Sequence, residues 1–87
     1  MKMDRIKFIT FILKSLQDGK EPKQADYELD LEQWGEIAEL IRDEGYAKNI
    51  SIQRAGFGLK VVYAWYDKAK ITMDGIKFLE TYSDKYS

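Results

Sequence analysis

Apolar residues recur at helical spacing in the first eighteen positions of the chain. The stripe consists of Ile6, Ile9, Leu13 and Leu16, and Phe8, Phe11 and Ile12 widen it. Asp4 can cap the start of this helix and Gly19 can end it, because glycine tolerates the left-handed conformation that follows many helices. The pattern predicts a helix over residues 4–18 that is packed on two sides.

Two further helices are predicted before the middle of the chain. Pro22 suits the first position of a short second helix that ends near Tyr27. The third helix has the best-defined start, with Asp30 as N-cap and Gln33 as its capping-box partner. Its apolar face includes Trp34, Ile37, Ala38 and Ile41, and Gly45 ends it.

After Gly45 the apolar positions alternate, which is typical of strands. One strand is predicted over residues 46–54, a turn over 55–58 and a return strand over 59–66. Alternation places Tyr63 and Trp65 on one face of the return strand, where we expect them to cover the core. Tyr66 points the other way and Phe57 sits at the turn, so we expect both of them to be exposed.

A last helix follows a polar corner at residues 67–70. Thr72 can cap this helix, with Ile76, Leu79 and Tyr82 facing inward. Gly75 lies in its first turn, where glycine lowers helix stability, and we attribute it to close approach of another backbone segment. Residues 83–87 are expected to fray.

Three helices, a two-stranded hairpin and a closing helix give the order of a winged helix. That fold is an α+β arrangement in which a helix-turn-helix core precedes a β-hairpin wing. A chain of 87 residues is the size of one small domain, so we expect residues 1–87 to form a single domain.

The segment AKITMDGIKFLETYS resembles the (I/L)T-x-x-G-x-x-(Y/F)-L signature that closes small bacterial and phage winged-helix proteins of the YjcQ family. The segments DRIKFITFILKSLQDG and LEQWGEIAELIRDEGYA also match the first and third helices of that family in order. These motifs concern capping and packing. The resemblance therefore implies a fold and carries over no reaction, ligand or functional residue.

The amino-acid composition excludes most kinds of catalytic site. The chain has no histidine and no cysteine, which excludes thiolate metal sites, cysteine nucleophiles and the usual proton-transfer residue near neutral pH. Pairs of carboxylates such as Glu36 and Glu39 are expected on a convex helix face, where water keeps them ordinary acids. We expect no enzymatic activity, no cofactor, no metal and no small-molecule substrate.

Charge is distributed unevenly along the chain. Residues 31–45 hold five carboxylates and one arginine, a net charge of −4, whereas residues 46–71 hold five cations and one carboxylate, a net charge of +4. The carboxylates expected on the surface of the third helix are Glu32, Glu36, Glu39 and Asp43. Phosphates would repel this helix, so it is a poor candidate for entering a DNA groove.

The hairpin carries the candidate contact residues. These are Lys48, Arg54, Phe57, Lys60 and Tyr66. The cations could meet phosphates, or they could serve only solubility and the protection of strand edges, which we favour. The aromatic residues could pack in the core, stack on single-stranded bases or anchor a protein interface.

Taken together, the sequence predicts a cytoplasmic protein without a signal peptide or membrane span. We expect a non-enzymatic interaction module that contacts a protein partner, or a second copy, through its basic aromatic wing and its acidic third helix. The alternative is a DNA-binding transcriptional regulator that touches phosphates mainly through the wing.

Overall fold

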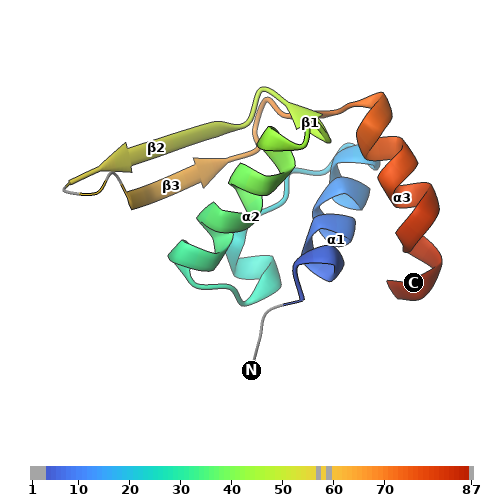
Figure 1. Ribbon diagram of the computed structural model, residues 1–87, viewed down its shortest axis with the longest axis horizontal. Coiled ribbons are helices and arrows are strands. Elements are labelled where there is room, and N and C mark those ends of the chain that lie inside the picture. Colours follow the sequence, from blue (N-terminus) through green and yellow to red (C-terminus); the bar gives the residue numbers. More distant parts are fainter. Residues whose placement is uncertain (1–3, 57, 59, 87) are drawn as a thin grey trace.

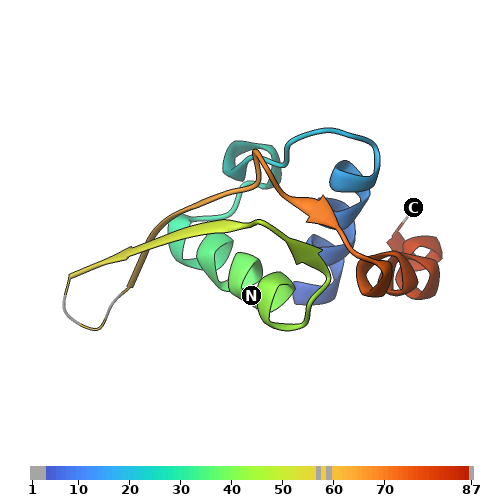
Figure 2. The ribbon, with the colours of Figure 1, turned by 90° about the horizontal axis from the view of Figure 1, so that it is seen from above.

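The protein is an α+β chain in which a hairpin extends from one end of a helical body (Figure 1). The computed structural model describes residues 4–56, 58 and 60–86. The elements are α1 (Arg5–Gln17), a short 3-10 helix η1 (Gln24–Tyr27), α2 (Leu31–Asp43), β1 (Ala47–Lys48), β2 (Ser51–Ala55), β3 (Lys60–Trp65), β4 (Lys70–Ile71) and α3 (Met73–Tyr86). Seen from above, the β2–β3 hairpin points away from α1 and α3 (Figure 2).

The predicted N-caps of the first and third helices are confirmed. The backbone N–H of Lys7 donates to Asp4 Oδ1 over 3.1 Å, and this hydrogen bond lowers the pKa of the Asp4 carboxyl. At α2 the capping box is complete, because Gln33 N donates to Asp30 Oδ1 over 2.8 Å and Asp30 N donates to Gln33 Oε1 over 3.1 Å. Each cap satisfies helix N–H groups that have no partner within the helix.

Trp34 lies at the centre of the core. Its ring stacks on Tyr27 with centroids 5.8 Å apart, and its Nε1–H donates to the backbone oxygen of Ala64 over 3.0 Å. This hydrogen bond ties α2 to β3. The remaining buried apolar residues come from α1, α2, β1, β3, α3 and the segments between elements: Ile9, Ile12, Leu13, Leu29, Ile37, Ala38, Ile41, Ala47, Ala64, Tyr66 and Leu79.

The predicted second helix is a short 3-10 helix. It ends at Tyr27, as predicted, but begins only at Gln24. Glu28 follows in the left-handed conformation with φ of 57°, which stops any further helical turn. One turn is all that fits, because Leu29 must return to the core before Asp30 caps α2.

The prediction of one continuous strand over residues 46–54 is wrong. Asn49, with φ of 64°, divides it into β1 and β2. β1 pairs with β4, which forms at the end of the predicted polar corner, and places Lys48 opposite Lys70. β2 pairs separately with β3, and the register shifts between Gln53 and Arg54. Two small antiparallel sheets therefore replace a single hairpin.

Hydrogen bonds join the start of α3 to the residues that follow α2. Thr72 Oγ1 donates to the backbone oxygen of Gly45 and accepts from Gly75 N over 3.1 Å. The N–H of Thr72 donates to the backbone oxygen of Tyr46 over 3.0 Å. A Cβ at Gly75 would lie 2.1 Å from that same oxygen, so the expectation of a close backbone approach is confirmed.

The prediction of a frayed C-terminal tail is also wrong. α3 continues to Tyr86, whose hydroxyl donates to Asp4 Oδ2 over 3.0 Å. The Tyr86 ring also meets Phe11 edge to face at 6.3 Å. Leu79 is buried and Tyr82 is half-buried, so α3 packs along α1 over its length.

Candidate interaction surface

The predicted acidic surface of the third helix exists and lines an open groove of ≈ 920 Å³. Its four carboxylates, Glu32, Glu36, Glu39 and Asp43, all border this groove. Leu31 and Leu40 add apolar surface from the same helix, and Arg54 and Gly58 border the groove from the hairpin. The groove therefore lies between the exposed face of α2 and the hairpin.

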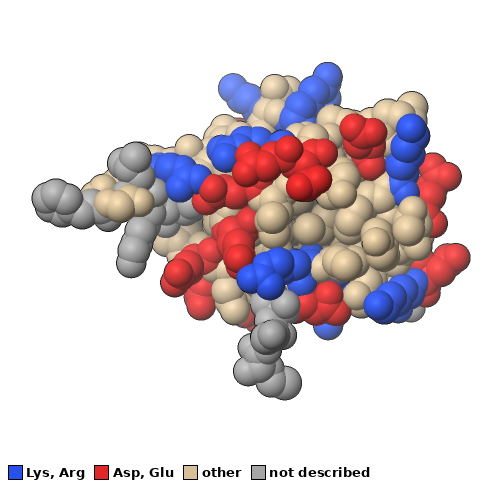
Figure 3. Space-filling view, in the orientation of Figure 1, with Lys and Arg blue, Asp and Glu red and all other residues tan. Residues whose placement is uncertain are grey.

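Arginines neutralise part of this acidic surface. Each of the three arginines in the sequence pairs with a carboxylate of α2. Arg5 Nη2 lies 2.7 Å from Glu36, and Arg42 Nε lies 3.1 Å from Asp43. Acidic and basic side chains are accordingly interspersed over α2 and the hairpin (Figure 3).

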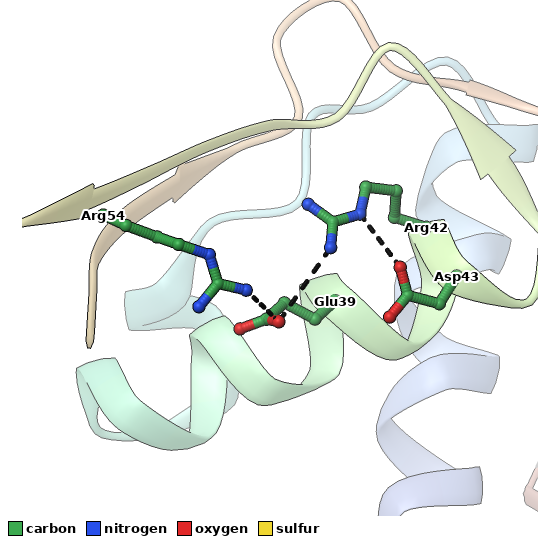
Figure 4. Close-up of polar contacts among 4 residues, drawn as sticks. All are labelled: Glu39, Arg42, Asp43 and Arg54. Atoms are coloured by element: carbon green, nitrogen blue, oxygen red, sulfur yellow. Dashed lines mark hydrogen bonds and ion pairs between the residues drawn. The ribbon is translucent and has the colours of Figure 1, made fainter. Parts of the chain in front are cut away.

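Arg54 is the contact that joins the hairpin to the acidic helix. Its Nη2 pairs with Glu39 Oε2, and Arg42 Nη2 lies 3.9 Å from the same oxygen (Figure 4). Sequence analysis assigned Arg54 to a contact with a partner, but the structure directs it to α2. With Arg5 and Arg54 added to residues 31–45, the local net charge changes from −4 to −2.

Tyr66 is buried, so its predicted exposure is wrong. Only 1% of its surface is accessible, and its ring meets Trp34 edge to face at 5.2 Å. Its hydroxyl makes no hydrogen bond to any residue in the described part of the chain. Burial, and to a lesser degree the neighbouring hydroxyl of Tyr27, raises the pKa of Tyr66.

Tyr63 and Trp65 occupy the opposite face of β3, where sequence analysis placed them on the core. Their exposed fractions are 40% and 38%, and their ring centroids are 4.6 Å apart. The face is set by Ala64, whose small side chain lets α2 approach close enough for the Trp34 hydrogen bond. This exposed pair is the surface feature that sequence analysis missed.

A signal for the correct face exists in the partner strand. Tyr63 pairs with Gln53, and Trp65 pairs with Ser51, which are both polar and exposed. Ile52 pairs with the buried Ala64 on the inner face. The polar alternation of β2 would therefore have identified the outer face, provided that the register across the turn was known.

Lys48 is exposed, as predicted, but it belongs to the β1–β4 sheet and not to the β2–β3 hairpin. It lies opposite Lys70, which is also exposed. Their neighbours in the pairing, Ala47 and Ile71, pack against the core, so both lysines point away from the helical body. Basic side chains project from the side of the molecule that carries β1 (Figure 3).

Two of the predicted contact residues cannot be placed. Phe57 lies outside the described residues, and so does the side chain of Lys60. Of the five predicted hairpin contacts, only Lys48 therefore stands in the described part of the chain as an exposed side chain directed away from the body. The candidate surface accordingly moves to the outward face of the strands.

The described residues contain no group of three or more acidic, histidine or cysteine side chains arranged to hold a metal ion. Among those same residues, no helix is both long enough and apolar enough to cross a membrane. The surface features are a partly neutralised acidic groove, two exposed aromatic rings on the β2–β3 hairpin and two exposed lysines on the β1–β4 sheet.

These features define a small α+β protein whose helical body carries a β-hairpin arm. The family model of the YjcQ protein matches residues 11–85, and the chain therefore belongs to the YjcQ family. No curated protein and no solved structure shows a significant match. The matched region includes the Thr72–Gly75 joint, so the structure gives the signature at the start of α3 a structural role.

Proposed function

We propose that this chain is a winged-helix interaction module without catalytic activity, and that it contacts its partner mainly through the outward face of its strands. The order of α1, η1, α2, the β2–β3 hairpin and α3 supports the winged-helix assignment, with η1 in the place of the second helix. The acidic groove along α2 is the second contact region in this proposal.

The exposed pair Tyr63 and Trp65 is the observation that carries this proposal. Two large aromatic side chains in contact on a solvent-facing strand leave apolar surface in water. Neither ring is needed by the core, because Ala64 and Tyr66 fill the inner face of the strand. Tyrosine and tryptophan are enriched at the centres of protein interfaces.

The carboxylates of α2 support a role in contact better than one in catalysis. Glu36, Glu39 and Asp43 are held by arginines on an accessible helix face. Catalytic acids and bases generally lie in sites that exclude bulk water. The three carboxylates of α2 instead lie on a helix face that is open to solvent.

Site-specific photo-cross-linking tests the proposed function. A benzophenone amino acid placed at Trp65 should give a discrete cross-linked protein product in cells, because this position lies on the outward face. The matched control is the same amino acid at Lys77, an exposed position of α3. Equal products from both positions, or none from Trp65, would refute the use of this face.

The rival function is a DNA-binding regulator that uses its strands, and Lys48 opposite Lys70 favours it. Two exposed lysines directly opposite each other can both meet phosphate. Fluorescence anisotropy with random duplex DNA at low and moderate salt measures this. Micromolar binding that falls steeply with salt, and that is lost in the double variant Lys48→Glu and Lys70→Glu, would establish DNA binding as the function.

A further inference from the structure

We propose that the partner of the strand face is a protein segment that combines carboxylates with apolar side chains. The strand face is defined here as Lys48, Tyr63, Trp65 and Lys70. This inference rests on the proposed function and specifies the chemistry of its partner. It follows from how the aromatic and cationic parts of this face are arranged.

The aromatic part forms one continuous apolar patch. The rings of Tyr63 and Trp65 have centroids 4.6 Å apart and an interplanar angle of 41°. A base inserted between two rings would need about 7 Å, since each stacking contact takes about 3.5 Å. The two rings already contact each other, so they offer a joint surface to an apolar side chain and no slot for a base.

The cationic part lies in the neighbouring β1–β4 sheet. Lys48 pairs directly opposite Lys70, and like charges in this position destabilise a sheet. Neither lysine forms an ion pair with any other described residue. An anionic group from a partner would relieve this repulsion.

The two parts are close along the chain. Ser51 lies opposite Trp65, and Lys48 precedes Ser51 by three residues, which corresponds to at most about 11 Å of extended chain. Ser51 and Gln53, which pair with the two rings, are exposed, and so are Lys48 and Lys70. A partner segment of a few residues can therefore reach both the rings and the lysines.

The distribution of charge favours a protein segment over a nucleic acid. A single strand carries a phosphate at every nucleotide, so its binding sites carry cations along the whole aromatic platform. Here the positions paired with the two rings are the uncharged Gln53 and Ser51. The two exposed lysines lie in the separate β1–β4 sheet, which matches a segment with carboxylates in one half and apolar side chains in the other.

Titration of the isotope-labelled full chain, followed by NMR, tests this inference. The probe is a synthetic 12-residue peptide with glutamate and aspartate in one half and leucine and phenylalanine in the other. We expect shifts at the indole N–H of Trp65 and the amides of Lys48 and Lys70. The indole N–H of Trp34, which donates to Ala64 inside the core, serves as the internal reference.

Three variants separate the contributions. We expect Trp65→Ala to weaken binding of the peptide about tenfold, as truncation of an interface anchor does. The double variant Lys48→Gln and Lys70→Gln should weaken peptide binding about fivefold at low salt and less at high salt. Lys77→Gln on α3 is the matched control and should leave affinity unchanged. Circular dichroism confirms that each variant is folded.

Two results would overturn the inference. The first is tighter binding of a 12-nucleotide oligothymidine at the same resonances, which would assign the strand face to nucleic acid. The second is the absence of any shift with the acidic peptide at millimolar concentration. If the Trp65 cross-link is still formed in that case, the interaction module stands and only the partner chemistry is wrong. Loss of the cross-link refutes the proposed function itself.

Discussion

Replacement of Gly75 by alanine tests the joint between α2 and α3 directly. In an open helix this change stabilises the protein by up to about 1 kcal/mol, because alanine has the higher helix propensity. Here the added Cβ would lie 2.1 Å from the backbone oxygen of Tyr46 and 2.7 Å from Cγ1 of Ile71. The first of these neighbours is backbone, so it cannot move aside by a rotamer change.

Relief of this contact must separate the start of α3 from the end of α2. Overpacking of this kind costs about 1–3 kcal/mol. The shift also weakens the bond from Thr72 N to Tyr46 O and the bond from Thr72 Oγ1 to Gly45 O, each of which contributes about 1 kcal/mol. After the gain in helix propensity is subtracted, we expect a net loss of about 2–4 kcal/mol.

Urea and thermal denaturation followed by circular dichroism measure this loss. A change of 1 kcal/mol moves the Tm of a domain of this size by about 4–8 °C, so Gly75→Ala should melt at least about 8 °C lower. Lys77→Ala, at an exposed position in the same helix, is the control and should change stability by less than about 0.5 kcal/mol. A Gly75→Ala protein as stable as the parent would refute the close contact and the role assigned to the family signature.

Three further predictions concern other contacts. Asp30→Ala removes the cap of α2 and should lower the free energy of unfolding by about 1 kcal/mol. Glu32→Ala is the control, at an exposed position of the first turn, and should lower it by less. Equal effects of the two variants in urea denaturation would contradict the capping role. Tyr66→Phe removes a buried hydroxyl without a described partner, so at pH 7 its stability should equal or exceed that of the parent. The pKa of Tyr66 is raised in the folded state from its ordinary value of 10.0, so this tyrosine ionises in the unfolded chain first as the pH rises. Above pH 10 the free energy of unfolding of the parent should therefore fall by about 1.4 kcal/mol per pH unit relative to that of Tyr66→Phe. Parallel pH profiles of the two proteins would contradict this. Arg54→Gln should lower the free energy of unfolding by less than about 1 kcal/mol, and the difference should shrink at high salt. A larger loss that does not depend on salt would show that the ion pair with Glu39 does more than neutralise charge.

The N-caps of the three α-helices and the end of α2 were predictable because they depend on residues close in sequence. Asp4 and Asp30 each bond to an N–H three residues ahead, and Thr72 does the same at α3. Gly45 takes the left-handed conformation that ends α2. Hydrogen bonds over three residues need no knowledge of the rest of the chain, which is why these signals also identified the family.

The candidate site was predicted less well because a strand has only two faces and an error of one residue exchanges them. The pattern of β3 allowed either Tyr63 and Trp65 or Ala64 and Tyr66 to face inward. The decision came from Trp34, on a different element, whose Nε1–H donates to the carbonyl oxygen of the small residue Ala64. Contacts between distant segments are invisible to local periodicity.

By itself, the sequence determined the three α-helices and their caps, the family, and the net charges of residues 31–45 and 46–71. Tertiary structure alone decided where those charges go and which aromatics are exposed. It paired Arg5 and Arg54 with α2, pairs that span 31 and 15 residues, and turned Tyr63 and Trp65 to solvent. Caps arise from neighbours along the chain, whereas ion pairs and strand faces arise from how whole elements pack, and only the folded chain specifies that packing.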